Sequence, residues 1–305
     1  MDDDRPDRAA LAISLSLLAL ALFAAMGLVI KHLSPFYSAA ELSAYRNLFG
    51  LIPSLVVLVT SSGWHERGRI WRLRQWKLAG FRGFCVACAQ FLYYISLANI
   101  AFATATTITY ANSLFMTALA IPLLGERVGA IRWIAVLIGF LGVMMIMKPG
   151  ADSFSIYSLA PLGAAFGYAL VGVLARWFDA DAPSPLINLY TSATAAVAAF
   201  VLAMVLGGFS PILDLGQLGW IMAMGGFGGT ATLLLVISFR MTEQSNIAPF
   251  NYFGIPMAFF FGWMFFDEAP VSDLFPGALL IVGGGLMVIW RERRIRRQTT
   301  TSIRS

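Results

Sequence analysis

Long apolar segments separated by short polar breaks run through the whole chain. Each is close to the roughly 20 residues that a helix needs to cross the hydrocarbon core of a membrane. The segments are uniformly apolar rather than alternating, which excludes a membrane β-barrel. The pattern predicts an all-α membrane protein with ten transmembrane helices, at residues 9–30, 38–60, 78–97, 103–124, 131–147, 157–178, 185–206, 218–239, 247–266 and 274–290.

The first apolar segment resembles a secretory signal in position but not in character. It follows an acidic start, is about 20 residues long and leads directly into further apolar segments. We therefore expect an uncleaved first helix.

The composition agrees with a protein that is mostly surrounded by lipid. Of the 305 residues, 59% are hydrophobic and 12% are charged, whereas soluble domains are about 25% charged. So few charges cannot cover a soluble surface of this size. Membrane lipid is thus an expected partner, and the length leaves no room for a large extramembrane domain.

The net charge of +5 reports on topology rather than on a nucleic-acid partner, because no soluble basic module is present. With a cytoplasmic N-terminus, eighteen of the 21 basic residues fall on the cytoplasmic side. Lys31 and Lys148 fall outside, and Arg46 lies within a span. This obeys the positive-inside rule and predicts that both termini are cytoplasmic, in a bacterial inner membrane.

The two halves of the chain repeat each other. Setting residue n against residue n+142 aligns Glu126 with Glu268, Tyr110 with Tyr252, and Gly142 with Gly284. Because each half has an odd number of helices, the second half is inverted in the membrane, as in many transporters. We expect a first repeat at residues 1–150, a second at 151–295 and a basic cytoplasmic tail at 296–305.

Two segments carry a resemblance to a known family: AFATATTITYANSLFMTALAIPLLGERVGAIRWIAVLIGFLGVMMIMKPG at 101–150 and SNIAPFNYFGIPMAFFFGWMFFDEAPVSDLFPGALLIVGGGLMVIW at 245–290. They are similar to the EamA repeats of the drug/metabolite transporter superfamily, in the branch that includes S-adenosylmethionine and riboflavin carriers. The resemblance implies a ten-helix carrier with a central cavity lined mainly by its first, third, fourth, sixth, eighth and ninth helices. The first repeat has Leu114 where the second has Pro256, so we expect any mid-helix break to be confined to the second half.

Arg46 is the one charge that the pattern places deep in a span. A charged side chain at a helix centre costs at least about 2.5 to 3.5 kcal/mol, so it needs a partner or a purpose. It could hold an anionic group of a substrate, or it could tie helices together through backbone carbonyls. Glu41 is five residues away and on a different helix face, so a direct pair within the helix is not expected.

Uncharged polar and aromatic residues within the spans form the candidate substrate site, because such groups are unfavourable facing lipid and supply hydrogen bonds and stacking faces in a cavity. The alternative is that each tyrosine is a packing or interfacial residue. The full candidate set is Arg46, Gln90, Tyr93, Tyr94, Tyr110, Asn112, Tyr168, Asn251, Tyr252 and Trp263.

The acidic residues are expected to be structural. Glu41 lies near a helix end, and no acid lies mid-span in another helix, which weakens a proton-antiport interpretation. Glu126 and Glu268 lie at helix ends, where they can cap a following helix or meet a loop arginine.

Small residues are expected to serve helix packing. Gly163 and Gly167, like Gly225 and Gly229, have GxxxG spacing, which permits close helix contact or a homodimer face. Cys85 and Cys88 form a CxxC within an apolar segment without a nearby histidine, so they are interpreted as packing residues.

No phosphate loop, metal motif or catalytic grouping is evident in the sequence, so no enzyme activity, cofactor or metal is expected. The leading hypothesis is a secondary carrier for a small aromatic or amphipathic metabolite of the amino-acid, nucleoside, riboflavin or S-adenosylmethionine class. Two alternatives are a lipid-linked sugar flippase or its subunit, and a non-transporting membrane scaffold or sensor.

Overall fold

The computed structural model describes residues 5–60, 71–125, 130–148, 155–179, 184–241, 250–268, 271–287 and 290, and within these ranges the chain is helical and has no strand. The all-α prediction is confirmed. The helices are α1 (Arg5–Leu33), α2 (Ala39–Thr60), α4 (Trp76–Asn99), α5 (Phe102–Thr109), α6 (Asn112–Leu124), α7 (Ala130–Met147), α8 (Leu159–Leu174), α9 (Ser184–Val205), α10 (Leu215–Met241), α12 (Gly254–Phe266) and α13 (Val271–Leu274). Short 3₁₀ turns, η1 (Ile156–Ser158) and η2 (Ala175–Trp177), flank α8, and a terminal helix covers Gly277–Met287.

Among the described residues, seven segments are long and apolar enough to cross a membrane: Ala10–Leu33, Ala39–Thr60, Trp76–Asn99, Phe102–Leu124, Ile156–Trp177, Leu186–Leu206 and Leu215–Leu235. Three shorter apolar helices, Trp133–Met147, Gly254–Phe266 and Gly277–Met287, complete the set. Each of the ten predicted segments overlaps one of these helices. The protein is therefore a multi-pass helical bundle.

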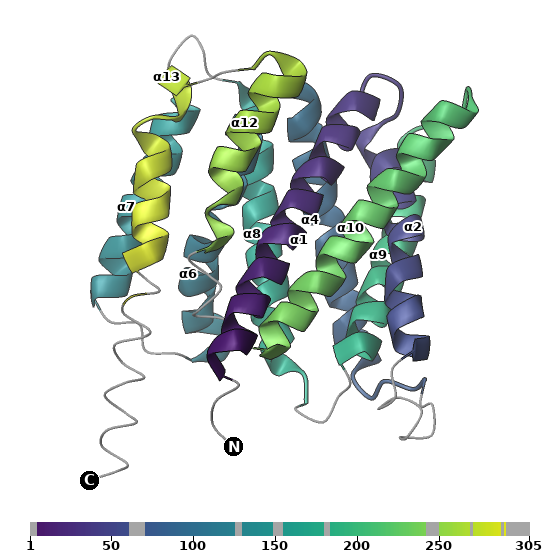
Figure 1. Ribbon diagram of the computed structural model, residues 1–305, viewed down its shortest axis with the longest axis horizontal. Coiled ribbons are helices and arrows are strands. Elements are labelled where there is room, and N and C mark those ends of the chain that lie inside the picture. Colours follow the sequence, from purple (N-terminus) through teal and green to yellow (C-terminus); the bar gives the residue numbers. More distant parts are fainter. Residues whose placement is uncertain are drawn as a thin grey trace.

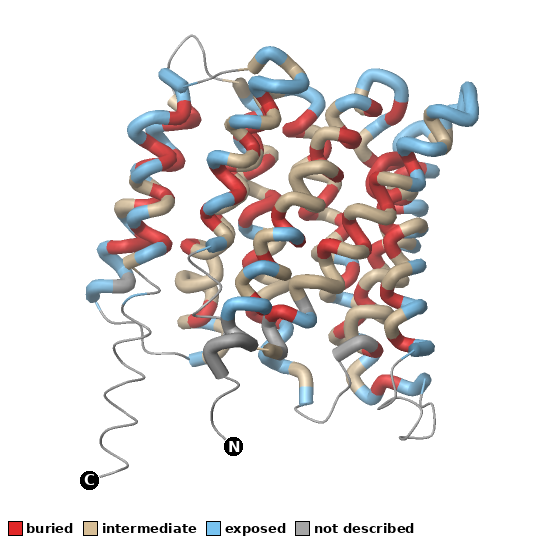
Figure 2. Tube along the Cα trace, viewed as in Figure 1, coloured by how far each residue is buried: buried red, intermediate tan, exposed pale blue. Residues whose placement is uncertain are grey.

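The long helices stand side by side in one bundle, with α7 at one end and α2 at the other (Figure 1). Following neighbours around the bundle, α1 packs on α10, α10 on α2, α2 on α9, α9 on α4, α4 on α8 and α8 on α6, while α5 packs on α12, which returns to α1. Buried positions lie where helices face each other, and exposed ones lie at the rim (Figure 2). Each helix of this ring therefore has one face toward the inside of the bundle.

Glycines set the closest helix contacts, as the GxxxG spacing predicts. A Cβ added at Gly229 would lie 2.8 Å from the carbonyl oxygen of Gly50, so α10 and α2 touch backbone to backbone. A Cβ at Gly167 would lie 2.8 Å from the Cβ of Ala89, which brings α8 onto α4. Larger residues would separate these helices.

A reciprocal glycine seam joins α7 to the terminal helix. A Cβ at Gly142 would lie 2.5 Å from the Gly277 oxygen, and a Cβ at Gly277 would lie 2.6 Å from the Gly142 oxygen. Further along the seam, a Cβ at Gly284 would lie 2.6 Å from the Ala135 oxygen. The two helices therefore run against each other with their backbones nearly in contact.

The expectation that a mid-helix break is confined to the second half is wrong. The predicted segment 103–124 divides into α5 and α6 at a turn of Tyr110 and Ala111, although neither residue is proline. The hydroxyl of Ser113 donates to the Tyr110 carbonyl (3.2 Å), which partly replaces the helical bond lost there. A turn at Tyr252 and Phe253 likewise precedes α12.

One edge of the bundle is held by a charged cluster. Lys31, near the end of α1, lies 2.5 Å from Glu268 and also donates to the Ile100 carbonyl (3.1 Å). The second carboxylate oxygen of Glu268 accepts from the Phe102 backbone amide at 2.8 Å, at the start of α5. Glu268 thus has a structural role, as expected, but its cation is the helical Lys31 rather than a loop arginine, and its carboxylate ties together α1, α5 and the end of α12. Glu126 lies outside the described residues.

Candidate functional site

A polar network lies on the inner faces of α2 and α4. The Asn47 amide donates to the Gln90 side-chain oxygen at 2.6 Å, and the Ser43 hydroxyl approaches the same oxygen at 3.3 Å. Asn47 in turn accepts from the guanidinium of Arg46 at 3.0 Å. All four side chains are buried. Hydrogen bonding within the network explains how these groups are accommodated inside a bundle of apolar helices.

Arg46 projects from α2 toward α10. Its Nη2 lies 3.4 Å from the Gly228 carbonyl and 3.4 Å from the Thr232 hydroxyl, both at the outer limit for a hydrogen bond. Its Nε has no hydrogen-bond partner in the described structure, and the ion pairs found among the described residues do not include Arg46. Residue 46 is only 9% exposed. A guanidinium is thus buried without a compensating negative charge from the described residues.

Three of the predicted tyrosines lie on α4 and α8, near the polar network. Tyr94 is 1% exposed, and its hydroxyl has no hydrogen-bond partner in the described structure. The Tyr93 hydroxyl is hydrogen-bonded to Thr106 of α5 at 3.0 Å, and its ring centroid lies 6.2 Å from that of Tyr94. Tyr168 lies on α8, which packs on α4 at the neighbouring residue Gly167. The structure therefore brings these predicted residues together.

A second cluster surrounds the two helix breaks. The rings of Tyr110 and Tyr252 are 6.2 Å apart, and the Tyr252 hydroxyl is hydrogen-bonded to Ser113 at 2.7 Å. Asn112 begins α6 beside this pair, and the buried side-chain oxygen of Asn251 has no partner in the described structure. The Tyr110 amide donates to the carbonyl of Thr106 at 3.2 Å, and the Thr106 hydroxyl is hydrogen-bonded to Tyr93. The aromatic residues therefore form a connected path from Tyr93 to Tyr252.

Trp263 does not join this path. Its side chain is 54% exposed and its ring lies against Phe260, which is 49% exposed. Both occupy the outward side of α12. In lipid this position suits an apolar aromatic residue, so we exclude Trp263 from the candidate site.

Arg82 is an intramembrane arginine that sequence reasoning missed. The prediction counted it with the cytoplasmic charges, but α4 begins at Trp76, which places Arg82 about 9 Å into the helix. Its Nε donates to the Val171 carbonyl of α8 at 3.1 Å, and its Nη1 donates to Thr191 of α9 at 3.2 Å. Both bonds are within the normal range, so Arg82 is a tie between helices.

Glu41 is occupied by structural bonds. It accepts from the Ser38 amide at 2.7 Å while the Ser38 hydroxyl accepts from the Glu41 amide at 3.3 Å, which is a capping box at the start of α2. Its other oxygen accepts from the Ser210 amide. The absence of a direct Arg46–Glu41 bond agrees with the sequence expectation.

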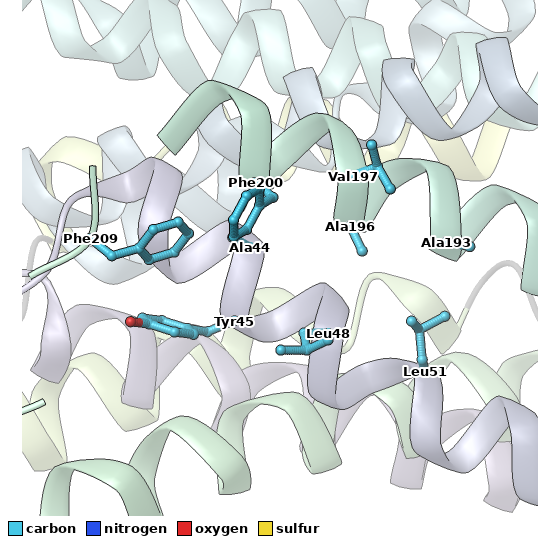
Figure 3. Close-up of a pocket in the computed structure, with 9 residues that line it drawn as sticks. All are labelled: Ala44, Tyr45, Leu48, Leu51, Ala193, Ala196, Val197, Phe200 and Phe209. Carbon is cyan, nitrogen blue, oxygen red and sulfur yellow. The ribbon is translucent and has the colours of Figure 1, made fainter. Parts of the chain in front are cut away.

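A concave feature lies on the outside of the bundle, between α2 and α9. It is a groove of about 520 Å³ lined by Ala44, Tyr45, Leu48, Leu51, Ala193, Ala196, Val197, Phe200 and Phe209 (Figure 3). The side chains of Leu48 and Val197 are 56% and 63% exposed. Leu48 is two residues from Arg46, about 200° around the helix, so the groove and the Arg46 side chain occupy opposite faces of α2.

Neither metal nor redox chemistry is supported by the described residues. They contain no group of three or more histidine, cysteine or acidic side chains placed to hold a metal ion. Cys85 and Cys88 are free thiols on α4.

Comparisons with known proteins give matches over most of the chain. Residues 10–148 and 155–290 match the EamA-like transporter family. A riboflavin transporter of Vibrio cholerae is 30% identical over 186 residues, covering 57% of this chain and 58% of that protein. An S-adenosylmethionine uptake transporter of Rickettsia felis is 22% identical over 284 residues, covering 91% and 92%.

Two further similarities cover nearly the full length. A pseudopaline exporter of Pseudomonas aeruginosa is 27% identical over 279 residues, covering 91% of this chain and 93% of that protein. A crystal structure with 20% sequence identity superimposes with a TM-score of 0.62 over 93% of this chain and 98% of its own. The latter similarity concerns the fold alone.

Proposed function

The chain belongs to the EamA-like transporter family of the drug/metabolite transporter superfamily, and on that premise we propose a secondary carrier that moves a small organic metabolite by alternating access. It is a multi-pass membrane transporter and not an enzyme. Its relatives include transporters for riboflavin and S-adenosylmethionine, the branch that the sequence resembles. The mechanism, the substrate class and the site are the proposal.

Helix packing supports two inverted repeats, at residues 1–150 and 151–295. Under the repeat relation, 142 is added to residue numbers in the first half and subtracted from those in the second. The α1–α10 contact then corresponds to α8–α4, the α2–α10 contact to α9–α4, and the α1–α12 contact to α8–α6. All of these contacts occur, and α2 with α9 forms a pair that exchanges with itself. Such a pseudo-two-fold arrangement is expected when two similar halves alternate between conformations.

Individual contacts follow the same exchange. A Cβ at Gly83 would clash with Thr191, and a Cβ at Gly225 would clash with Phe49; these residues are partners under the 142-residue shift. The Gly142–Gly277 contact pairs in the same way with the Gly284–Ala135 contact. These correspondences support ten crossings that include the three shorter helices.

The charge distribution supports cytoplasmic termini. α1 begins and the terminal helix ends at the same edge of the bundle (Figure 1). Lys31 and Lys148, the two lysines assigned to the outside, pair with Glu268 and Asp273. By the positive-inside rule the opposite edge is cytoplasmic, and the bacterial relatives favour an inner membrane. The basic tail at 296–305 lies outside the described residues.

The observation that carries the proposed site is the set of buried polar atoms without partners inside the helix ring. Arg46 Nε and the Tyr94 hydroxyl are desolvated and make no hydrogen bond in the described structure. Leaving such groups unsatisfied costs about 1 to 3 kcal/mol each, so water or a substrate should complete them. We assign substrate binding to Arg46, Gln90, Tyr93, Tyr94 and Tyr168, with Tyr110, Asn112, Asn251 and Tyr252 along the path.

The two alternatives are less well supported. A lipid-linked sugar flippase needs an opening that connects the lipid to the polar site, but the α2–α9 groove lies on the face of α2 opposite Arg46. A scaffold would have no use for unpaired buried donors at the centre of the bundle.

Counterflow in proteoliposomes tests the proposal. A thermal-stability screen against amino acids, nucleosides, riboflavin, S-adenosylmethionine and quaternary amines first selects the solute. Arg46→Ala and Tyr252→Ala should then each reduce counterflow at least tenfold, while Trp263→Ala, the matched aromatic control on the outer face, should not. Wild-type counterflow by both site variants would show that the site is wrong.

A further inference from the structure

The two intramembrane arginines differ in how well their hydrogen-bonding groups are satisfied. Arg82 makes bonds of 3.1 and 3.2 Å from Nε and Nη1. Arg46 makes one bond of 3.0 Å, to the neighbouring Asn47, and two contacts of 3.4 Å, and its Nε makes none in the described structure. Both lie about 10 Å into their helices. Linking helices accounts for the hydrogen bonds of Arg82 but not for the unpaired Nε of Arg46.

The position equivalent to Arg46 in the second half is occupied by a neutral residue. Residue 188, which is 142 positions later, is an asparagine whose amide donates to Ser54 of α2 at 3.2 Å. A neutral amide therefore suffices to link helices at this position of the repeat. Helix linkage alone does not account for the positive charge of Arg46.

The surroundings of Arg46 are rich in donors and lack negative charge in the described structure. Asn47, Gln90, Ser43 and Thr232 are neutral, and Glu41, the acid nearest in sequence, is held by two backbone amides. Tyr94 lies one helical turn after Gln90 on α4, and Gln90 is linked through Asn47 to Arg46. The Tyr94 hydroxyl has no hydrogen-bond partner in the described structure. A positive charge beside a free hydroxyl donor is a suitable binding environment for an anionic oxygen.

We propose that the transported solute is a small organic anion whose carboxylate binds Arg46 and accepts a hydrogen bond from Tyr94. The rings of Tyr93 and Tyr94 lie 6.2 Å apart on α4, and Tyr168 is on the neighbouring helix α8; these aromatic faces favour a flat apolar body attached to that carboxylate. The assignment rests on the proposed carrier function and specifies its substrate class. The charge also makes the site asymmetric, because the first half has an arginine at this position and the second half has a neutral asparagine.

The test uses matched pairs of aromatic carboxylates and their carboxamides. The pairs are indole-3-acetate with indole-3-acetamide and phenylacetate with phenylacetamide, with riboflavin as an uncharged aromatic probe and sodium chloride as an inorganic anion. Thermal stability of the purified full-length protein is measured at millimolar probe concentrations, since ligands that bind the folded state raise it. At least one carboxylate should stabilise the protein more than its amide and more than chloride.

Arginine variants identify the responsible group. Arg46→Gln should weaken carboxylate affinity about 10- to 100-fold, the range expected for a charge-assisted hydrogen bond. Arg46→Lys should retain part of the preference, and Arg82→Lys, the matched control, should retain all of it. Equal stabilisation by amides, stabilisation by chloride alone, no carboxylate response, or a preference that survives Arg46→Gln would each overturn the assignment. Counterflow of an uncharged solute that depends on Tyr252 would leave the carrier function intact while refuting the anionic substrate.

Discussion

Replacing Glu268 with glutamine should measurably loosen the edge of the bundle opposite the proposed cytoplasmic face. In the structure the two carboxylate oxygens serve different partners: one contacts Lys31 and the other accepts from the Phe102 amide. The Lys31 and Glu268 side chains are only 14% and 27% exposed. A glutamine has one acceptor oxygen, so its amide group must face one of these two donors.

The expected loss follows from these contacts. A hydrogen bond to a charged group contributes about 1.5 to 3 kcal/mol. Lys31 would keep its bond to the Ile100 carbonyl at 3.1 Å and its position 5.1 Å from the Phe266 ring centroid, which limits the damage. We therefore expect Glu268→Gln to lower stability by about 2 kcal/mol, or roughly 4 to 8 °C in apparent melting temperature on the scale of large domains.

A second ion pair on the same edge provides the control. Lys148 and Asp273 are 2.7 Å apart, but their side chains are 41% and 54% exposed. Exposed pairs contribute about 0 to 1 kcal/mol, so Asp273→Asn should shift the melting temperature little. Both variants can be measured by thermal denaturation in detergent. Equal shifts for the two variants, or a larger shift for Asp273→Asn, would refute the reasoning from burial.

Two further predictions concern packing and a buried hydroxyl. Gly225→Ala should lower stability by about 1 to 3 kcal/mol because its Cβ would clash with Phe49, whereas Gly226→Ala, with no atom within 4 Å of its Cβ, should be neutral in the same assay. Burial and two nearby carboxylates raise the pKa of Tyr37 above 10.0, and its hydroxyl donates to Gln217 at 2.6 Å. The neutral form is therefore favoured on folding, so wild-type stability should fall as the pH rises above about 10. A Tyr37→Phe variant should lose about 1 kcal/mol at neutral pH and lack this tyrosine's alkaline loss, which pH-dependent melting measures; parallel curves for both proteins would contradict it.

The sequence was sufficient to predict the helical elements and the unusual position of Arg46, because length and charge are strong signals in a membrane. It was insufficient to orient the helices. Both the lipid-facing and the inward-facing sides of a membrane helix are apolar, so the pattern could not show that Trp263 faces outward.

The break between α5 and α6 was not predicted, for a different reason. Proline is the usual signal for a break, but here a serine hydroxyl satisfies the carbonyl freed at Tyr110. Arg82 lies within the predicted segment 78–97, but because it is near the cytoplasmic end it was counted with the loop charges; α4 begins at Trp76 and so adds two residues of helix before it.

The glycine seam between α7 and the terminal helix has an evolutionary consequence under the proposed repeat relation. The repeat relation maps this contact onto itself. Two copies of one half would form the same contact as a homodimer in which one copy is inverted in the membrane. Such a dimer would require the same polypeptide to insert in both orientations, with a weak charge bias. Fusion into one chain removes that requirement, because each half can then acquire its own distribution of basic residues. Fusion also allows the equivalent positions 46 and 188 to differ, as arginine and asparagine. A symmetric ancestor could in this way gain a site that distinguishes the two ends of its substrate.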